Sequence, residues 1–174
     1  IVHPDCPNFF EETDHNYCGV MNDGCYEWVT RSIRDFNQEL FTGVTPPHPS
    51  TYINGGFQIV NKKHKKFFSN MKEFYSGNKE RIQYAIDKIK AGTDQTIVNY
   101  MLEINEVDVK ILPACYNLQD LFRKNLLHIP GHSWWPDTLE GMYSAGWVYH
   151  FNAIPQNERH ANYWIERTYK ELYR

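Results

Sequence analysis

Apolar positions along the chain change from strand spacing to helical spacing and back. Residues 17–21 and 52–60 are rich in β-branched and aromatic side chains, which favours strands. Residues 27–40 repeat apolar side chains at the spacing of an amphipathic helix. These side chains are Trp28, Val29, Ile33, Phe36 and Leu40. Strands that alternate with helices are typical of the α/β class.

The middle of the chain continues this alternation. Residues 61–75 predict a helix packed against the sheet, and residues 79–90 predict a second helix that ends at Gly92. Thr93 offers an N-cap hydroxyl for a third helix that continues to residue 102.

The last third contains shorter patterns. A strand is predicted before Pro113, which ends it, and another over residues 147–151. Residues 128–146 have no period and predict a long ordered loop, a type of segment that often carries function. Residues 155–174 predict a closing helix. Its inward side chains are expected to be Ala161, Trp164, Ile165 and Leu172.

Length and composition are those of one globular domain over residues 1–174. Hydrophobic residues make up 41% of the 174 residues, which is enough for a core, and no repeat or linker divides them. The net charge of −3 excludes an overall electrostatic attraction to nucleic acid. Residues 62–66 (Lys-Lys-His-Lys-Lys) would attract an anionic donor or membrane surface locally, or form a solvated helix face. No apolar run is long enough for a transmembrane segment.

The four cysteines, which are scattered along the chain, help to indicate the cellular compartment of the protein. Cys6, Cys18, Cys25 and Cys115 form no CxxC pair, so we expect free thiols, with one disulfide among the first three as the alternative. Nothing resembles a signal peptide, which favours the cytoplasm. The lumen of the secretory pathway is the alternative, because a disulfide would form there.

Three polar groups are unusual at their predicted positions. They are Asn54, Gly55 and Gly56 inside a strand, Asp94 and Gln95 at a helix start, and His150 and Asn152 at a strand end. Glycine weakens a strand and marks a bulge or a close backbone approach. Ligands of open α/β sheets bind at strand ends, where such groups converge. Each group also has a structural interpretation: a bulge, a charge at a helix N-terminus, and a buried histidine.

Four motifs occur in an order that resembles a known family. "INGGFQIVN", "TDQTIVN", "LPACYN" and "VYHFNA" resemble the later motifs of family 8 glycosyltransferases with the GT-A fold. The resemblance extends to about residue 159. It implies a Rossmann-like mixed sheet flanked by helices, and an enzyme that moves a sugar from a nucleotide-diphosphate donor to a carbohydrate or glycosylated acceptor with retention of configuration. The opening "IVHPDCPNFFE" is similar to the segment after the family's Asp-x-Asp motif. The chain would then be the C-terminal, acceptor-side part of such a domain.

The resemblance also implies roles for individual residues. His150 would bind a divalent metal, Mn²⁺ or alternatively Mg²⁺. Asp94 would bind sugar hydroxyls and Gln95 would face the anomeric carbon, as the catalytic pair. Residues in contact with the donor would be Asn54, Gly55, Gly56, Asn152 and Arg159. Three positions depart from the family pattern: Thr96 replaces an aspartate, Ala153 a glycine and Gln156 a lysine, whose charge Arg159 would supply.

Two other classes of function remain open. One is a noncatalytic carbohydrate or nucleotide-sugar binding module on the same scaffold. The other is a zinc hydrolase built on His128 and His132, although Pro130 and Gly131 interrupt that spacing. The loop tryptophans, Trp134, Trp135 and Trp147, would either cover an acceptor or belong to the core.

Overall fold

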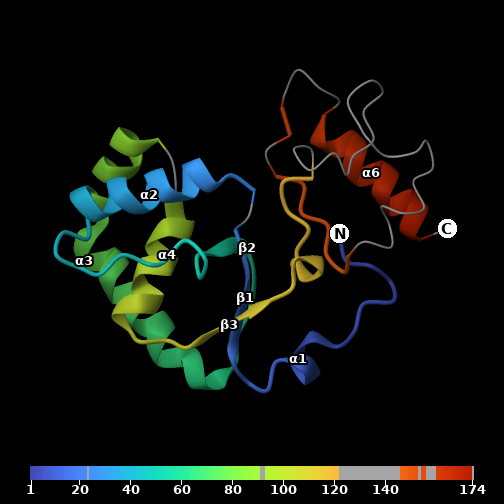
Figure 1. Cartoon of the computed structure of the whole chain (residues 1–174), viewed down its shortest axis with the longest axis horizontal. Coiled ribbons are helices and arrows are strands. Elements are labelled where there is room, and N and C mark those ends of the chain that lie inside the picture. The colour runs from blue at the N-terminus through green and yellow to red at the C-terminus, as the bar shows by residue number, and fades with distance from the viewer. Residues whose placement is uncertain (23, 91–92, 122–145, 153, 156–159, 174) are drawn as a thin grey trace. The chain divides into compact units, whose positions relative to one another are not determined.

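The computed structural model describes residues 1–22, 24–90, 93–121, 146–152, 154–155 and 160–173. The chain forms two compact units (Figure 1). The larger unit is Phe9–Leu112, and the smaller unit combines Ile1–Asn8 with Pro113–Arg174. A single domain over residues 1–174 stays a prediction. Most of the predicted loop at 128–146 lies outside the described residues, together with His128, His132, Trp134 and Trp135.

The larger unit is built on a small mixed sheet, which confirms the predicted α/β class. Its strands are β1 (Tyr17–Met21), β2 (Ile53–Ile59) and β3 (Val109–Leu112), in the order β2-β1-β3. Strand β1 pairs antiparallel with β2 and parallel with β3. All three strands lie within one or two residues of the predicted segments, because their apolar, β-branched runs are bounded by polar or proline residues.

Strand β2 bulges where its glycines occur. Gly19 of β1 pairs with Gln58, and Met21 pairs with Ile53. Between these two pairs, β1 advances by two residues while β2 covers five. The extra residues of β2 include Asn54, Gly55 and Gly56, which therefore lie outside the regular ladder. The bulge, one of the two structural interpretations of the glycines, is therefore present as a shift in the register of β2 against β1.

The same unit contains three helices, α2 (Tyr26–Glu39), α3 (Lys65–Ile89) and α4 (Thr93–Ile104) (Figure 1). They pack on one another, and α4 contacts β2. A short helix, α1 (Phe9–Glu12), precedes β1, and the 3₁₀ turn η1 (Lys62–His64) leads into α3. Two predicted helices, over 61–75 and 79–90, are one helix with a kink at Asn78, where φ is −123° and ψ is 16°. The Asn78 side chain donates to the carbonyl of Phe74 at 2.9 Å, so a polar side chain supports the turn before the kink.

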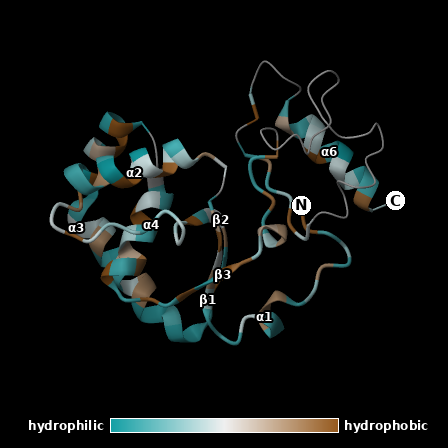
Figure 2. Ribbon diagram, in the orientation of Figure 1, coloured by the Kyte–Doolittle hydropathy of each residue, from teal (hydrophilic) through white to brown (hydrophobic). Residues whose placement is uncertain are grey.

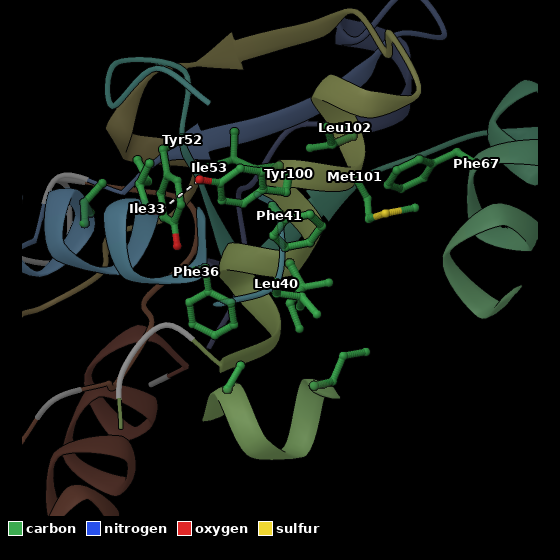
Figure 3. Packing of buried hydrophobic residues seen from close by; sticks show 14 of the residues in the cluster. Ile33, Phe36, Leu40, Phe41, Tyr52, Ile53, Phe67, Tyr100, Met101 and Leu102 are labelled. Atoms are coloured by element: carbon green, nitrogen blue, oxygen red, sulfur yellow. Dashed lines mark hydrogen bonds between the residues drawn. The ribbon is translucent and has the colours of Figure 1, made fainter. Parts of the chain in front are cut away.

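The core of the larger unit is rich in aromatic rings. Tyr100 of α4 stacks on Phe41 with ring centroids 4.2 Å apart, and Phe41 also stacks on Phe74 of α3. The Tyr100 hydroxyl donates to the carbonyl of Ile33 in α2 at 2.8 Å (Figure 3). A buried tyrosine therefore links two helices without leaving its hydroxyl unpaired. In Figure 2, the helices show brown bands beside teal ones, as amphipathic helices do.

The described residues of the smaller unit have less regular structure than predicted. The elements among them are η2 (Ala114–Tyr116) and α6 (Ala161–Leu172). The strand prediction over 147–151 is wrong, since only isolated bridges form, from Val148 to Val2 and from Tyr149 to Leu118. A segment that pairs at single positions on each side cannot extend a ladder.

Helix α6 also corrects two expectations. It begins at Ala161, six residues after the predicted start at Pro155. Trp164 is buried as expected, but Ile165 is 39% exposed and Thr168 is buried instead. Thr168 lies one turn after Trp164 and shares its face, whereas Ile165 is rotated by about 100°.

Two further expectations concern the cysteines and membrane-spanning segments. All four cysteines are free, as predicted. Among the described residues, no helix is both long and apolar enough to cross a bilayer.

Gly77 in α3 offers a test of the helix assignment. A Cβ added there meets nothing within 4 Å. We expect Gly77→Ala to raise the free energy of unfolding by about 0.5–1 kcal/mol, the helix-propensity difference. Gly43→Ala is the matched control, because Gly43 has a φ of +82° and alanine would be strained there. Urea unfolding of both variants measures the effect, and a less stable Gly77→Ala would contradict an unobstructed helical position.

His64 at the start of α3 predicts a pH dependence of stability. It is 7% exposed, and its Nδ1 accepts a hydrogen bond from the Asn61 backbone at 3.1 Å, which requires a neutral Nδ1. Burial, and secondarily the charge of Lys63, lowers the pKa of His64 below the ordinary value of about 6.5. The unfolded chain then binds the proton more readily, so this contribution to stability is present above pH 6.5 or so and is lost as the pH falls toward the folded pKa.

The variant His64→Gln isolates this contribution, because glutamine accepts a hydrogen bond but does not titrate. We expect its free energy of unfolding to fall less steeply than that of the parent chain between pH 7.5 and pH 5, roughly the window set by the histidine pKa. Urea unfolding at each pH provides the values. Equal slopes for the two proteins would contradict the role of His64.

Candidate functional site

Strand β2 and helix α4 are joined through the side chain of Asn99. Its Oδ1 accepts from the Ile53 backbone N–H at 2.8 Å, and its Nδ2 donates to the Ile53 carbonyl at 2.9 Å. The same Nδ2 donates to the carbonyl of Gln95 at 2.9 Å. One carboxamide thus satisfies both backbone groups of a strand residue, as a neighbouring strand would. Asn99 is 2% exposed, so these bonds are formed away from solvent.

Gln95 continues the connection one turn earlier in α4. Its Oε1 accepts from the Gly55 backbone N–H at 2.8 Å and from Asn54 Nδ2 at 3.3 Å. The Gly55 N–H fixes the orientation of the carboxamide, because the opposite orientation would point two donors at each other. Nε2 of Gln95 is buried and has no hydrogen-bond partner in the described part of the chain.

Asn54 stabilises the bulge from within. It is 4% exposed, and its Oδ1 accepts from the Gly56 backbone N–H at 2.9 Å. This contact from residue i to residue i+2 is an Asx-type turn, which lets a strand depart from its ladder without unpaired backbone groups. Gly55 and Gly56 are exposed at the outer side of this turn.

Gly55 is required by the approach of α4. A Cβ at this position would lie 3.3 Å from the Cβ and 3.5 Å from the Cγ of Gln95. The contact at 3.3 Å is tighter than an ordinary van der Waals contact, so a side chain at residue 55 would require Gln95 to shift by a few tenths of an ångström. The group that comes close to this backbone is therefore a side chain of the protein itself.

Tyr52 and Thr96 extend the polar contacts into the core. Their hydroxyls are 2.7 Å apart, and both residues are fully buried. Burial raises the pKa of Tyr52 to about 12, although the hydrogen bond with Thr96 acts in the opposite direction. In the sequence resemblance described above, an aspartate would be expected at residue 96, where this chain has threonine. A carboxylate there would be a buried charge beside a tyrosine, so threonine is the better choice in this environment.

Asp94 is the exposed charged residue of this region. It lies in the first turn of α4, where the partial positive charge of the helix end favours a carboxylate. Burial raises the pKa of Tyr75, and the charge of Asp94 adds to that shift. We call Asn54, Gly55, Gly56, Asp94 and Gln95 the β2–α4 site, because Gln95 of α4 contacts Asn54 and Gly55 of β2, and Asp94 and Gly56 adjoin these contacts in the chain.

Two further predicted residues belong to the smaller unit. The His150 backbone N–H donates to the Leu118 carbonyl at 2.8 Å, while its buried Nδ1 has no hydrogen-bond partner in the described part of the chain. Burial lowers the pKa of His150, which favours the neutral imidazole. Asn152 uses its Oδ1 to accept from the Asp120 backbone at 2.7 Å. Arg159 lies outside the described residues.

His150 is the metal ligand that the resemblance implies. Within the described ranges, no three His, Cys, Asp or Glu side chains are grouped as metal ligands. His150 could provide one neutral imidazole nitrogen, and a manganese or magnesium site needs several oxygen ligands besides. The described residues alone therefore do not form a metal site, and a metal stays a prediction of the resemblance.

Three residues of the network were not predicted: Asn99, Tyr52 and Thr96. Asn99 follows Gln95 by four residues, so both lie on one helix face. A polar residue repeated at that spacing in the apolar run "TIVNYML" was a usable signal for Asn99. No comparable signal existed for the Tyr52 and Thr96 contact, which joins positions 44 residues apart.

The exposed part of the β2–α4 site combines neutral and acidic polar groups. It presents the backbone of two glycines and, in the adjoining turn of α4, the carboxylate of Asp94. Carboxylates and backbone amides suit a neutral ligand with several hydroxyl groups, which both donates and accepts. No family model, curated protein or solved structure matches this chain.

Proposed function

We propose that the chain is a glycosyltransferase of the GT-A type, which moves a sugar from a nucleotide-diphosphate donor to a carbohydrate or glycosylated acceptor. The proposal rests on the four ordered motifs. Its main support is that Gln95 contacts both Asn54 and Gly55, since two motifs 40 residues apart meet at one position.

Asp94 and Gln95 have different tasks in this proposal. Asp94, exposed in the first turn of α4, accepts hydrogen bonds from sugar hydroxyls as a charged acceptor. Gln95 Oε1 already accepts two hydrogen bonds, which use both of its lone pairs. For Gln95 to face an anomeric carbon, the longer contact with Asn54 at 3.3 Å must open when the donor binds.

The remaining proposed roles concern the donor diphosphate. His150 would contribute a neutral nitrogen to a Mn²⁺ or Mg²⁺ ion, and such an ion would stabilise negative charge on the leaving diphosphate. Arg159 would contribute a positive charge to the same group. Asn152 holds the backbone of Asp120 through its Oδ1, and its Nδ2 would donate to the donor.

Donor binding is the direct test. The purified chain is titrated with a panel of nucleotide sugars, with and without Mn²⁺, and binding is followed by saturation-transfer NMR. We expect one donor to bind, and Asp94→Asn to weaken it by about tenfold, the effect of losing one charge-assisted hydrogen bond. Glu80→Gln is the matched control, because Glu80 is an exposed carboxylate on α3.

The outcome also separates an enzyme from a binding module. Release of the nucleoside diphosphate in the presence of a donor indicates transfer or hydrolysis, and binding without release indicates a noncatalytic module. If no nucleotide sugar binds under any condition, or if Asp94→Asn and Glu80→Gln behave alike, the β2–α4 site is not a donor site.

A further inference from the structure

A group of exposed lysines surrounds the start of α3. Lys62 and Lys63 lie on η1, Lys65 and Lys66 in the first turn of α3, and Lys72 two turns later. All five are exposed, while His64 and Phe67 between them point into the core. We call these five lysines the basic face. No acidic residue occurs between residues 62 and 72, although the chain as a whole has a net charge of −3.

The arrangement of the basic face is unfavourable for the fold itself. Lys62 lies three and four residues before Lys65 and Lys66, a spacing at which like charges repel on a helix. The first turn of α3 contains no acidic residue, and its helix end already carries partial positive charge. A surface group that opposes local stability in this way is typical of a functional surface.

The positive charge of the basic face is not neutralised within the described chain. The ion pairs among the described residues involve Arg34, Lys88, Lys110 and Lys170. None of them joins one of these five lysines to a carboxylate. Glu73 follows Lys72 in α3, and Asp14 forms its ion pair with Lys110, at 3.9 Å. An anionic partner would therefore meet several uncompensated ammonium groups on one face.

An aromatic ring at the edge of the basic face favours one kind of partner. Phe68 is 43% exposed and stacks loosely on Tyr17, with ring centroids 6.5 Å apart. A small soluble anion would gain nothing from contact with an exposed phenyl ring. A bilayer, in contrast, presents phosphate groups at its surface and apolar chains just beneath, so it can contact both the lysines and the ring. We propose that the basic face, with Phe68, docks the protein on a membrane surface that contains anionic phospholipids.

The position of the basic face makes this proposal independent of the proposed function. Lys62 follows the end of β2 that is opposite to Asn54, so docking leaves the β2–α4 site outside the contact. Variants of these lysines should not alter ligand binding at that site, and failure of the glycosyltransferase proposal would not affect docking.

Vesicle binding tests the proposal. The full chain is mixed with vesicles of phosphatidylcholine, with or without about one-third phosphatidylserine, and sedimented at several salt concentrations. We expect binding only to the anionic vesicles, and weaker binding as salt rises, because counterions screen exposed charges. Lys65→Gln combined with Lys66→Gln should weaken binding by about 25-fold, since each lysine near an anionic surface contributes about fivefold.

Controls separate this effect from a general loss of charge. Lys79→Gln combined with Lys90→Gln removes the same charge from exposed positions of the same helix region and should leave binding unchanged. Phe68→Ser tests the aromatic contribution and should weaken binding by a few fold. Equal loss in the two lysine pairs, or no preference for anionic vesicles, would overturn the proposal. Binding to soluble polyphosphate without binding to vesicles would overturn it as well.

Discussion

Replacing Asn99 with alanine is expected to lower the free energy of unfolding by about 3 kcal/mol. The substitution leaves the N–H and the carbonyl of Ile53 without partners in a region where Ile53 is fully buried. Each unsatisfied buried group costs about 1–3 kcal/mol, and the small cavity left by the side chain adds to this loss. Urea unfolding followed by circular dichroism measures the change.

Two further variants identify the physical cause. Asn99→Leu keeps the volume of the side chain but forms none of its hydrogen bonds, so we expect it to be about as unstable as Asn99→Ala. Asn105→Ala, directly after α4, serves as the control, because Asn105 is only partly buried and its side chain contacts the Met101 carbonyl and the side chain of Asn70 but no strand backbone. If leucine restored stability, the packing of Asn99 would matter and its hydrogen bonds to Ile53 would not.

The strands and helices of the larger unit follow from local sequence. β1, β2, β3 and α2 lie within one or two residues of the predicted segments. Each has a strong apolar period and ends at proline, glycine or polar residues, which are local signals. Such signals do not report how two helical patterns are joined. The link between 61–75 and 79–90 was therefore predicted as a break, where the structure has only a kink at Asn78.

The smaller unit shows where local patterns are insufficient. Residues 147–151 have strand composition, but a strand also needs a partner along its length, and this segment finds bridges only at Val148 and Tyr149. Ile165 is apolar and was expected in the core, but the buried face of α6 contains Trp164 and Thr168 instead. Both errors arise because burial is decided by tertiary packing, which composition does not contain.

The candidate site was predictable in its members but not in its contacts. Its unusual glycines and the polar start of α4 were visible in the sequence. The contact of Gln95 with Gly55 depends on the five-residue step in the pairing of β2, because that step brings the bulge against α4. A register is a long-range property, fixed only when β1 and α4 pack on β2. Asn99 was missed for the same reason, since its partner Ile53 is 46 residues away.

The second large effect is expected at Gly55, where valine should lower the free energy of unfolding by about 2 kcal/mol, within the range for an overpacked position. Its Cβ would stand 3.3 Å from the Cβ of Gln95, and its two methyl groups would add volume at this close contact. Gln95 would then move, and its 2.8 Å hydrogen bond to the Gly55 N–H would be lost. Alanine at residue 55 should have a smaller effect, because only the Cβ has to be accommodated.

A double-mutant cycle with Gln95 shows whether this clash is the cause. Gln95→Ala removes the Cγ and the hydrogen-bonding oxygen, so Gly55→Val should be less destabilising in that background than in the parent chain. Residues in direct contact couple by about 0.5–3 kcal/mol, whereas separated residues add independently. Additive effects in urea unfolding would mean that valine destabilises β2 without meeting α4. A clear coupling would establish that Gly55 is a glycine because Gln95 packs against it.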